Sequence, residues 1–237
     1  SVETLWNSLR ADRKLGETEW TEKTVAFDYT LPKHLIFGFP GCEAINIQQH
    51  AAFMVPLLRK ELGCYYVDQA VSCGIPGDMC TLPLVETGVA VEGEYPDIGN
   101  FWMTTNNPCD ANMMDNNAMY RMLSSNGKKA VHPLTSPMMY DDPTTKELGV
   151  HEIYEAIDFM EQQFGRKFDW DAFAKHCAAT NKVNREELER WDIGATTANT
   201  PLNPVCLAMY RIYFYQQGGT KHFARSSEKI LKLYYKA

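Results

Sequence analysis

The stretch FWMTTNNPCDANMMDNNAMYRMLSSNGKKAVHP, residues 101–133, decides how the chain is expected to fold. Its first residues, 101–104, form a short apolar run that is typical of a buried strand, and a helical pattern follows from Cys109 to Leu123. A further strand is expected at 129–132, and it ends at Pro133. A strand, a helix and another strand, joined at turn-forming residues, predict a parallel sheet with helices on its faces.

The same alternation extends upstream of residue 101. An apolar run at 34–39 predicts a strand, and apolar residues spaced by threes and fours predict a helix over 44–62 that Pro56 interrupts. A further strand at 65–67 is expected before a helix over 79–90. The fold class is therefore predicted to be α/β, with a Rossmann-like parallel sheet.

The pattern becomes helical downstream of Asp142-Pro143. One apolar stripe ends at Gly165, and Asp169 is expected to cap the next helix. Further helices are expected around Leu188 and Trp191 and over 206–217 and 225–235. We therefore divide the chain into an irregular or helical lead-in (1–30), a Rossmann-like α/β domain (31–143) and a helical region (144–237).

Composition and charge exclude several classes of protein. An apolar fraction of 45% fills a core, and a net charge of −7 without a basic stripe argues against a nucleic-acid partner. No apolar run approaches the roughly 18 residues of a membrane span, and the first residues do not resemble a signal peptide. We therefore expect a cytoplasmic protein with no membrane partner.

Seven cysteines without a C-x-x-C pair indicate free thiols or metal ligands from separated loops. Cys80 and Cys109 are each expected just past a strand, where a helix begins. Ligands bind at this carboxyl edge of a parallel sheet, and a helix N-terminus stabilises the thiolate that ligates iron or attacks an electrophile. A buried small side chain is the equal alternative for each.

The other candidate residues are weaker. Glu43 is expected to open the helix after the first strand, either as a cap or as an acid or base at the mouth of the crevice. Buried small side chains are expected at Cys42, Cys64, Cys177 and Cys206, and the role of Cys73 stays open. The histidines form no constellation, and no nucleotide-binding or hydrolase motif occurs.

The order and spacing of several segments resemble the 2-hydroxyacyl-CoA dehydratase and benzoyl-CoA reductase family. These segments are GDMCTLPLVETG (77–88), FWMTTNNPCD (101–110) with the helix and strand that follow, and GRKFD (165–169) within a helical insertion. The resemblance covers about residues 35–237. It implies an iron–sulfur subunit of a heterodimer that pairs with a homologous subunit.

The resemblance also implies chemistry. An ATP-hydrolysing iron–sulfur activator supplies an electron to a [4Fe–4S] cluster, and an acyl-CoA is dehydrated through a ketyl radical in anaerobic metabolism; a benzoyl-CoA reductase reduces an aromatic ring instead. Cys80 and Cys109 match two of the three cysteine ligands, and Glu43 is the local candidate for proton handling. The third cysteine has no counterpart here, so we expect a fragment of a longer subunit.

Two other hypotheses remain. The chain is a non-catalytic partner or scaffold of such a complex, which the missing third cysteine favours. Alternatively, Cys80 or Cys109 is a metal-free nucleophile or redox sensor. The second hypothesis lacks a histidine that the sequence places as a base.

Overall fold

The computed structural model describes residues 24–27, 33–95, 101–105, 109–124, 130–135 and 142–236. These residues divide into two compact units. The first unit takes the described residues of Ser1–Ile36 and Gly41–Phe168, and the second takes those of Phe37–Pro40 and Asp169–Ala237. The predicted domain boundary at residue 143 stays a prediction.

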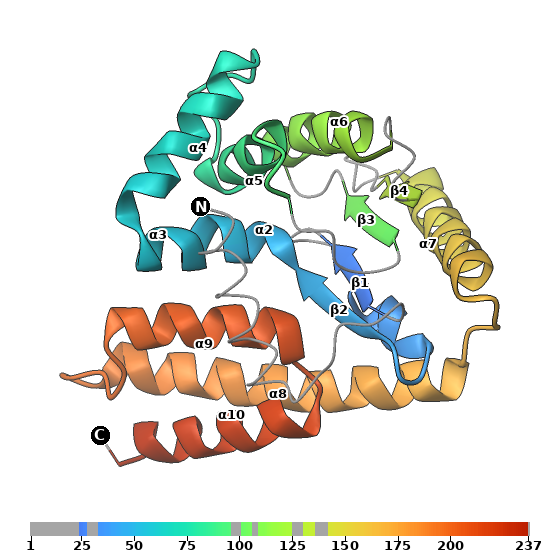
Figure 1. The fold of residues 1–237 in the computed structure, drawn as a ribbon. Helices are drawn as coiled ribbons and strands as arrows, with labels where there is room; N and C mark the ends of the chain where they lie inside the picture. Colours follow the sequence, from blue (N-terminus) through green and yellow to red (C-terminus); the bar gives the residue numbers. More distant parts are fainter. Residues whose placement is uncertain are drawn as a thin grey trace. The chain divides into compact units, whose positions relative to one another are not determined.

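A four-stranded parallel sheet lies within the first unit (Figure 1). Its strands are β1 (Thr24–Phe27), β2 (Glu43–Asn46), β3 (Phe101–Thr105) and β4 (Ala130–Leu134), in the order β2-β1-β3-β4. Ala26 of β1 pairs with Ile45 on one side and with Trp102 on the other. The predicted α/β fold with a parallel sheet is therefore confirmed.

Helices connect and flank the strands. They are the 3-10 helix η1 (Lys33–Gly38), α2 (Ile47–Gln49), the π-helix η2 (His50–Met54), α3 (Val55–Leu58), α4 (Lys60–Ser72), α5 (Thr81–Val91), α6 (Asp110–Ser124) and α7 (Pro143–Phe164). The helices predicted over 79–90 and 109–123 are confirmed as α5 and α6. The strand predicted at 101–104 is β3, and the strand predicted at 129–132 is β4, with residue 129 outside the described residues.

Two predictions near the first strand are wrong. The run at 34–39 forms η1 rather than a strand, because its buried residues Leu35, Ile36 and Phe39 follow a helical spacing and not an alternation. The first strand instead lies at Thr24–Phe27, inside the predicted irregular or helical lead-in. Every residue of β1 is buried between two neighbouring strands, so a run of four residues suffices there.

The region from 43 to 72 also differs from its prediction. The expected helix over 44–62 begins as strand β2 and continues through a π-helix, a feature that apolar spacing does not reveal. The strand predicted at 65–67 lies within helix α4, where Tyr66 and Ala70 face the core one helical turn apart.

The core of the first unit joins the sheet to these helices. Trp102, Ala26 and Ile45 from three adjacent strands pack with residues of the helices in one cluster of buried side chains. Helices α4 and α5 approach so closely that a Cβ on Gly88 would lie 1.9 Å from the carbonyl oxygen of Tyr66. Only glycine allows this contact between the two backbones.

The second unit contains three long helices, namely α8 (Trp170–Thr196), α9 (Pro204–Gln217) and α10 (Lys221–Tyr234). The side chain of Asp169 accepts a hydrogen bond from the N–H of Ala172 at 2.9 Å, which confirms the predicted cap. The separate helix expected around Leu188 and Trp191 is wrong, because α8 continues without a break through both residues. The two helices predicted after residue 204 are confirmed.

A buried ion pair joins the helices of the second unit. The guanidinium of Arg190 donates to Glu187 at 2.7 Å, and both side chains are nearly inaccessible. The phenol of Tyr210, on α9, also donates to Glu187, and that of Tyr234, on α10, lies 3.5 Å from Arg190. The polar atoms of this ion pair therefore link α8 to both neighbours.

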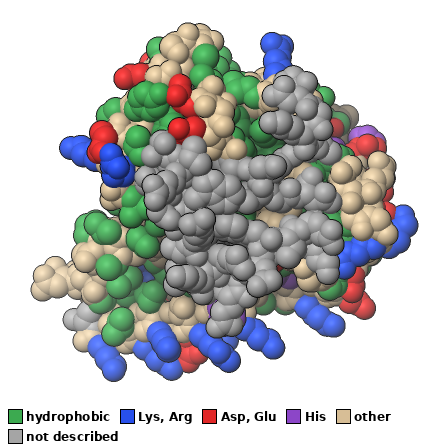
Figure 2. All heavy atoms as spheres, viewed as in Figure 1, with side chains coloured by type: hydrophobic (Ala, Val, Ile, Leu, Met, Phe, Trp, Pro, Cys, Tyr) green, Lys and Arg blue, Asp and Glu red, His purple; other side chains and the backbone are tan. Residues whose placement is uncertain are grey.

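The exposed face of α10 is basic. Figure 2 shows Lys and Arg side chains along the margin of the view where α8 and α10 lie. The exposed cations of this C-terminal segment are Lys221, Arg225, Lys229, Lys232 and Lys236. Of these cations, only Lys232 forms an ion pair within the described residues, and its partner is Glu228. A solvated amphipathic helix explains this face.

The close approach at Gly88 makes a prediction. Gly88→Ala should lower the free energy of unfolding of the first unit by about 3 kcal/mol, because the added Cβ meets the Tyr66 carbonyl and forces α4 and α5 apart. Gly149→Ala is the matched control, since a Cβ there meets nothing within 4 Å, and it should stabilise α7 by about 0.5 to 1 kcal/mol. Denaturant unfolding followed by circular dichroism measures both, and equal effects would contradict the packing described.

Candidate functional site

Polar side chains are buried where strands β2 and β3 end. Asn46 is the last residue of β2, Thr104 and Thr105 end β3, and all three are at most 1% exposed. Parallel strands bring their carboxyl ends to one edge of the sheet, so these polar groups share that edge. The Asn46 side chain caps α2 by accepting a hydrogen bond from the N–H of Gln49 at 2.9 Å. The carboxyl edge is therefore polar although it is buried.

Asp115 lies at the centre of this polar region. The hydroxyl of Thr87, on α5, donates to its Oδ1, and the Nε2 of Gln48, on α2, donates to its Oδ2 at 3.3 Å. The neighbouring Asn116 accepts a hydrogen bond from the hydroxyl of Thr104. The two adjacent residues of α6 thus connect this helix to α5, to α2 and to the end of β3.

This polar cluster was missed by the sequence analysis. Asn112, Asp115 and Asn116 form a polar stripe at helical spacing, a pattern that usually marks the solvated face of a helix. In the structure this stripe is buried and faces the other polar side chains. The signal that was available is the surplus of polar residues on a helix whose remaining faces are only moderately apolar, and it does not say which face points inward.

Cys109 occupies the position that the sequence predicted. It follows strand β3, across residues outside the described part, and directly precedes α6. Its carbonyl oxygen accepts a hydrogen bond from the N–H of Met113 at 3.1 Å, which is the first turn of the helix. The side chain is half-buried. Cys109 therefore lies where a helix N-terminus meets the carboxyl edge of the sheet.

Cys80 is placed differently from its prediction, although it also precedes a helix. The element before Cys80 is helix α4 and not a strand, because the segment predicted as a strand at 65–67 belongs to α4. Cys80 occupies the N-cap position of α5, but its side chain forms no capping hydrogen bond. The residue is exposed. The thiol is therefore accessible at the start of a helix that packs against α6.

The structure brings together the two helices that these cysteines precede. Helices α5 and α6 are in contact, and the Thr87–Asp115 hydrogen bond joins them. Within the described ranges, no three or more His, Cys, Asp or Glu side chains gather in an arrangement suited to a metal ion.

Glu43 does not lie where the sequence predicted. It is the first residue of β2 rather than the start of a helix, so it lies at the amino edge of the sheet, opposite the edge that carries Cys109. The argument from the positive end of a helix is therefore wrong for this residue. Its role as an acid or base is left as a prediction without structural support.

The other cysteines vary in their surroundings. Cys42 is buried, as expected, and its sulfur accepts a hydrogen bond from Arg166 at 2.8 Å. Cys177 is half-buried, and burial raises the pKa of its thiol. Cys64 and Cys206 are exposed, which contradicts the prediction that they are small core residues, and Cys73 is exposed as well.

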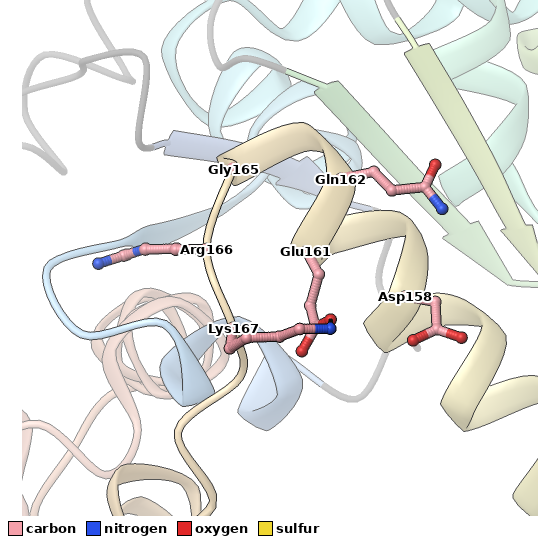
Figure 3. Close-up of a pocket in the computed structure, with 6 residues that line it drawn as sticks. All are labelled: Asp158, Glu161, Gln162, Gly165, Arg166 and Lys167. Carbon is pink, nitrogen blue, oxygen red and sulfur yellow. Dashed lines mark hydrogen bonds and ion pairs between the residues drawn. The ribbon is translucent and has the colours of Figure 1, made fainter.

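A pocket of about 360 Å³ lies at the end of α7 and is lined by Asp158, Glu161, Gln162, Gly165, Arg166 and Lys167 (Figure 3). In this view Lys167 and Glu161 point toward each other, and Lys167 forms an ion pair with Glu161. Arg166 points away from them and contacts Cys42, just before the amino end of β2. The two acidic and two basic side chains of the pocket therefore balance in charge. The pocket lies near the amino edge of the sheet, whereas Cys109 lies at the carboxyl edge.

The buried hydrogen bonds of Asp115 make a second prediction. Asp115→Ala should lower the free energy of unfolding by about 2 to 4 kcal/mol, because the Thr87 hydroxyl and the Gln48 amide lose their buried acceptor. Asp110→Ala, at the exposed first residue of the same helix, should cost less than about 1 kcal/mol. Chemical denaturation of both variants measures the difference, and a loss confined to Asp110→Ala would refute the assignment.

Among the described residues, none of the helices combines the length and apolar character that crossing a bilayer requires. A search of curated proteins gave no match. The family model of the 2-hydroxyglutaryl-CoA dehydratase D-component matches residues 49–236, a span that includes Cys80, Cys109, Thr87 and Asp115 and begins just after Gln48. This match covers more than three quarters of the 237 residues, and it confirms the resemblance drawn from the sequence. The chain belongs to the family of the 2-hydroxyglutaryl-CoA dehydratase D-component.

Proposed function

We propose that the chain is a subunit of an ATP-activated, [4Fe–4S]-dependent enzyme that dehydrates a 2-hydroxyacyl-CoA to an enoyl-CoA. Family membership supports a dehydratase component that acts on CoA thioesters. The observation that carries the proposal is the position of Cys80 and Cys109, each directly before one of two helices that contact each other. Cys80 is exposed and Cys109 is half-buried, and cysteine sulfur is the usual protein ligand of iron–sulfur clusters.

The donor set of the described chain fits such a cluster only in part. Thiolates are the usual ligands of iron–sulfur clusters, and Cys80 and Cys109 supply two of them. The resemblance assigns neither Cys177 nor Cys206 as a ligand. We propose that another region of the subunit or a partner subunit supplies the missing thiolate.

The partners follow from the same proposal. A homologous second subunit forms a heterodimer with this one, and a separate ATP-hydrolysing iron–sulfur protein delivers the electron that starts each dehydration. The role of this chain's own residues is to hold Cys109 next to the polar carboxyl edge of the sheet and Cys80 at the start of the neighbouring helix α5. The buried side chains of Asn46, Thr104 and Asp115 form that edge.

A non-catalytic role is the second candidate. It is favoured by the incomplete donor set, since no group of three metal-binding side chains forms among the described residues. In that case the chain pairs with a cluster-bearing homologue and its cysteines bind no iron. Benzoyl-CoA reductase activity differs from dehydration in its product, a reduced ring. The iron content and the CoA product therefore distinguish dehydration, ring reduction and a non-catalytic role.

The cluster proposal predicts which cysteines bind iron. In the full-length subunit, purified with its partner without oxygen, Cys80→Ser and Cys109→Ser should each remove most of the bound iron and sulfide of this subunit, because a serine hydroxyl replaces a thiolate ligand. Cys206→Ser is the matched control, since Cys206 is also exposed and lies in the first turn of a helix. Equal iron contents in all three variants would favour the non-catalytic role.

The reaction itself is tested with the assembled complex. With ATP, its activator and a strong reductant, the complex should convert a 2-hydroxyacyl-CoA to the enoyl-CoA, and omission of ATP should abolish the conversion. Chromatography of the CoA esters measures the product. Reduction of benzoyl-CoA with no dehydration would replace the proposed reaction with ring reduction, and neither product with a fully assembled, iron-loaded complex would reject both.

A further inference from the structure

Cys80 lies at the end of a loop that does little to fix its position. The loop from Cys73 to Cys80 leaves α4 and enters α5, and its residues are exposed or half-exposed. Such a loop contributes few buried contacts. The position of the Cys80 thiol therefore depends on how helix α5 itself is held.

Helix α6, by contrast, is tied to the sheet. The hydroxyl at Thr104, near the end of β3, donates to Asn116 of α6. The next strand, β4, follows α6 in the chain and pairs with β3 along its whole length. Helix α6, which Cys109 precedes, thus contacts both β3 and β4 of the sheet.

One buried contact connects the two helices near their cysteines. The hydroxyl of Thr87 donates to Asp115, and both side chains are at most 1% exposed. Thr87 follows Cys80 by seven residues and Asp115 follows Cys109 by six, which corresponds to roughly 9 to 11 Å along each helix axis. A helix is stiff over two to three turns. A change in the Thr87–Asp115 contact that moves α5 relative to α6 therefore also moves the Cys80 thiol relative to the Cys109 thiol.

We propose that Thr87 and Asp115 form a clamp that sets the separation between Cys80 and Cys109. Gln48, which donates to the second oxygen of Asp115, holds that carboxylate in the orientation that the Thr87 hydroxyl needs. These are positioning residues, because they act on the thiols through α5 and α6. The inference rests on the proposed function only in the use that it gives to this separation, namely the binding of a cluster.

The geometry is tested without any cluster. Spin labels are attached to Cys80 and Cys109 in the full-length subunit, with serine at the four other accessible cysteines, Cys64, Cys73, Cys177 and Cys206. Pulsed electron–electron double resonance then gives the distribution of distances between the two labels. Thr87→Val, which keeps the side-chain shape and removes the hydroxyl, should broaden this distribution or shift its mean by more than its original width.

Two further variants separate positioning from stability. Thr87→Ser restores the hydroxyl and should return the narrow distribution. Tyr66→Phe, the matched control, removes another hydrogen bond of the first unit, from Tyr66 to Glu94, and should leave the distribution unchanged. A narrow, unshifted distribution in Thr87→Val, or equal broadening in Tyr66→Phe, would overturn the clamp.

The assembled, iron-loaded complex supplies the second readout. Thr87→Val should shift the reduction potential and the electron paramagnetic resonance spectrum of the cluster, and Thr87→Ser should restore both. If no iron binds, the proposed function fails while the distance measurement still decides the clamp. If iron binds with an unchanged spectrum in Thr87→Val, the clamp does not act on the cluster and the inference is rejected.

Discussion

The carboxylate of Asp115 is the group on which the arrangement of the first unit's helices depends. It is buried at the carboxyl edge of the sheet, where it accepts hydrogen bonds from α5 and α2. A buried carboxylate is costly unless its oxygens are satisfied, so the loss of either donor is expected to destabilise the unit. An apolar residue at this position would hold α5 and α6 together without specifying their relative position.

The sequence predicts those parts of the fold in which local pattern and tertiary position agree. The segment from β3 through α6 to β4 follows this rule, because its sequence pattern changes where each strand or helix ends. Strand β1 does not, since its four residues are buried only because β2 and β3 flank it. The π-helix at His50–Met54 and the unbroken course of α8 depend likewise on packing that no local pattern reports.

The candidate site divides in the same way. The positions of Cys80 and Cys109 before helices could be predicted because a cysteine at a helix start is a local feature of the sequence. Glu43 was misplaced because its assignment relied on a strand at 34–39 that is a 3-10 helix, and the error moved it to the opposite edge of the sheet. Asp115 was missed because its role exists only through residues 28 and 67 positions away in the chain.

The two units stabilise their buried charges by different means. In the second unit, Glu187 is paired with Arg190, and a phenol on α9 adds a further donor. Both partners of this pair lie on α8, so the hydrogen bonds of Tyr210 and Tyr234 connect the pair to α9 and α10. Replacing both partners of a buried ion pair by apolar residues often preserves stability. Asp115 instead receives hydrogen bonds from the neutral groups of Thr87 and Gln48. A hydrogen bond constrains the direction as well as the distance between its two partners, so the contacts of Asp115 specify how α2 and α5 lie against α6. Under the proposed function Cys80 and Cys109 bind one cluster, and the positions of α5 and α6 then set the separation of their thiols.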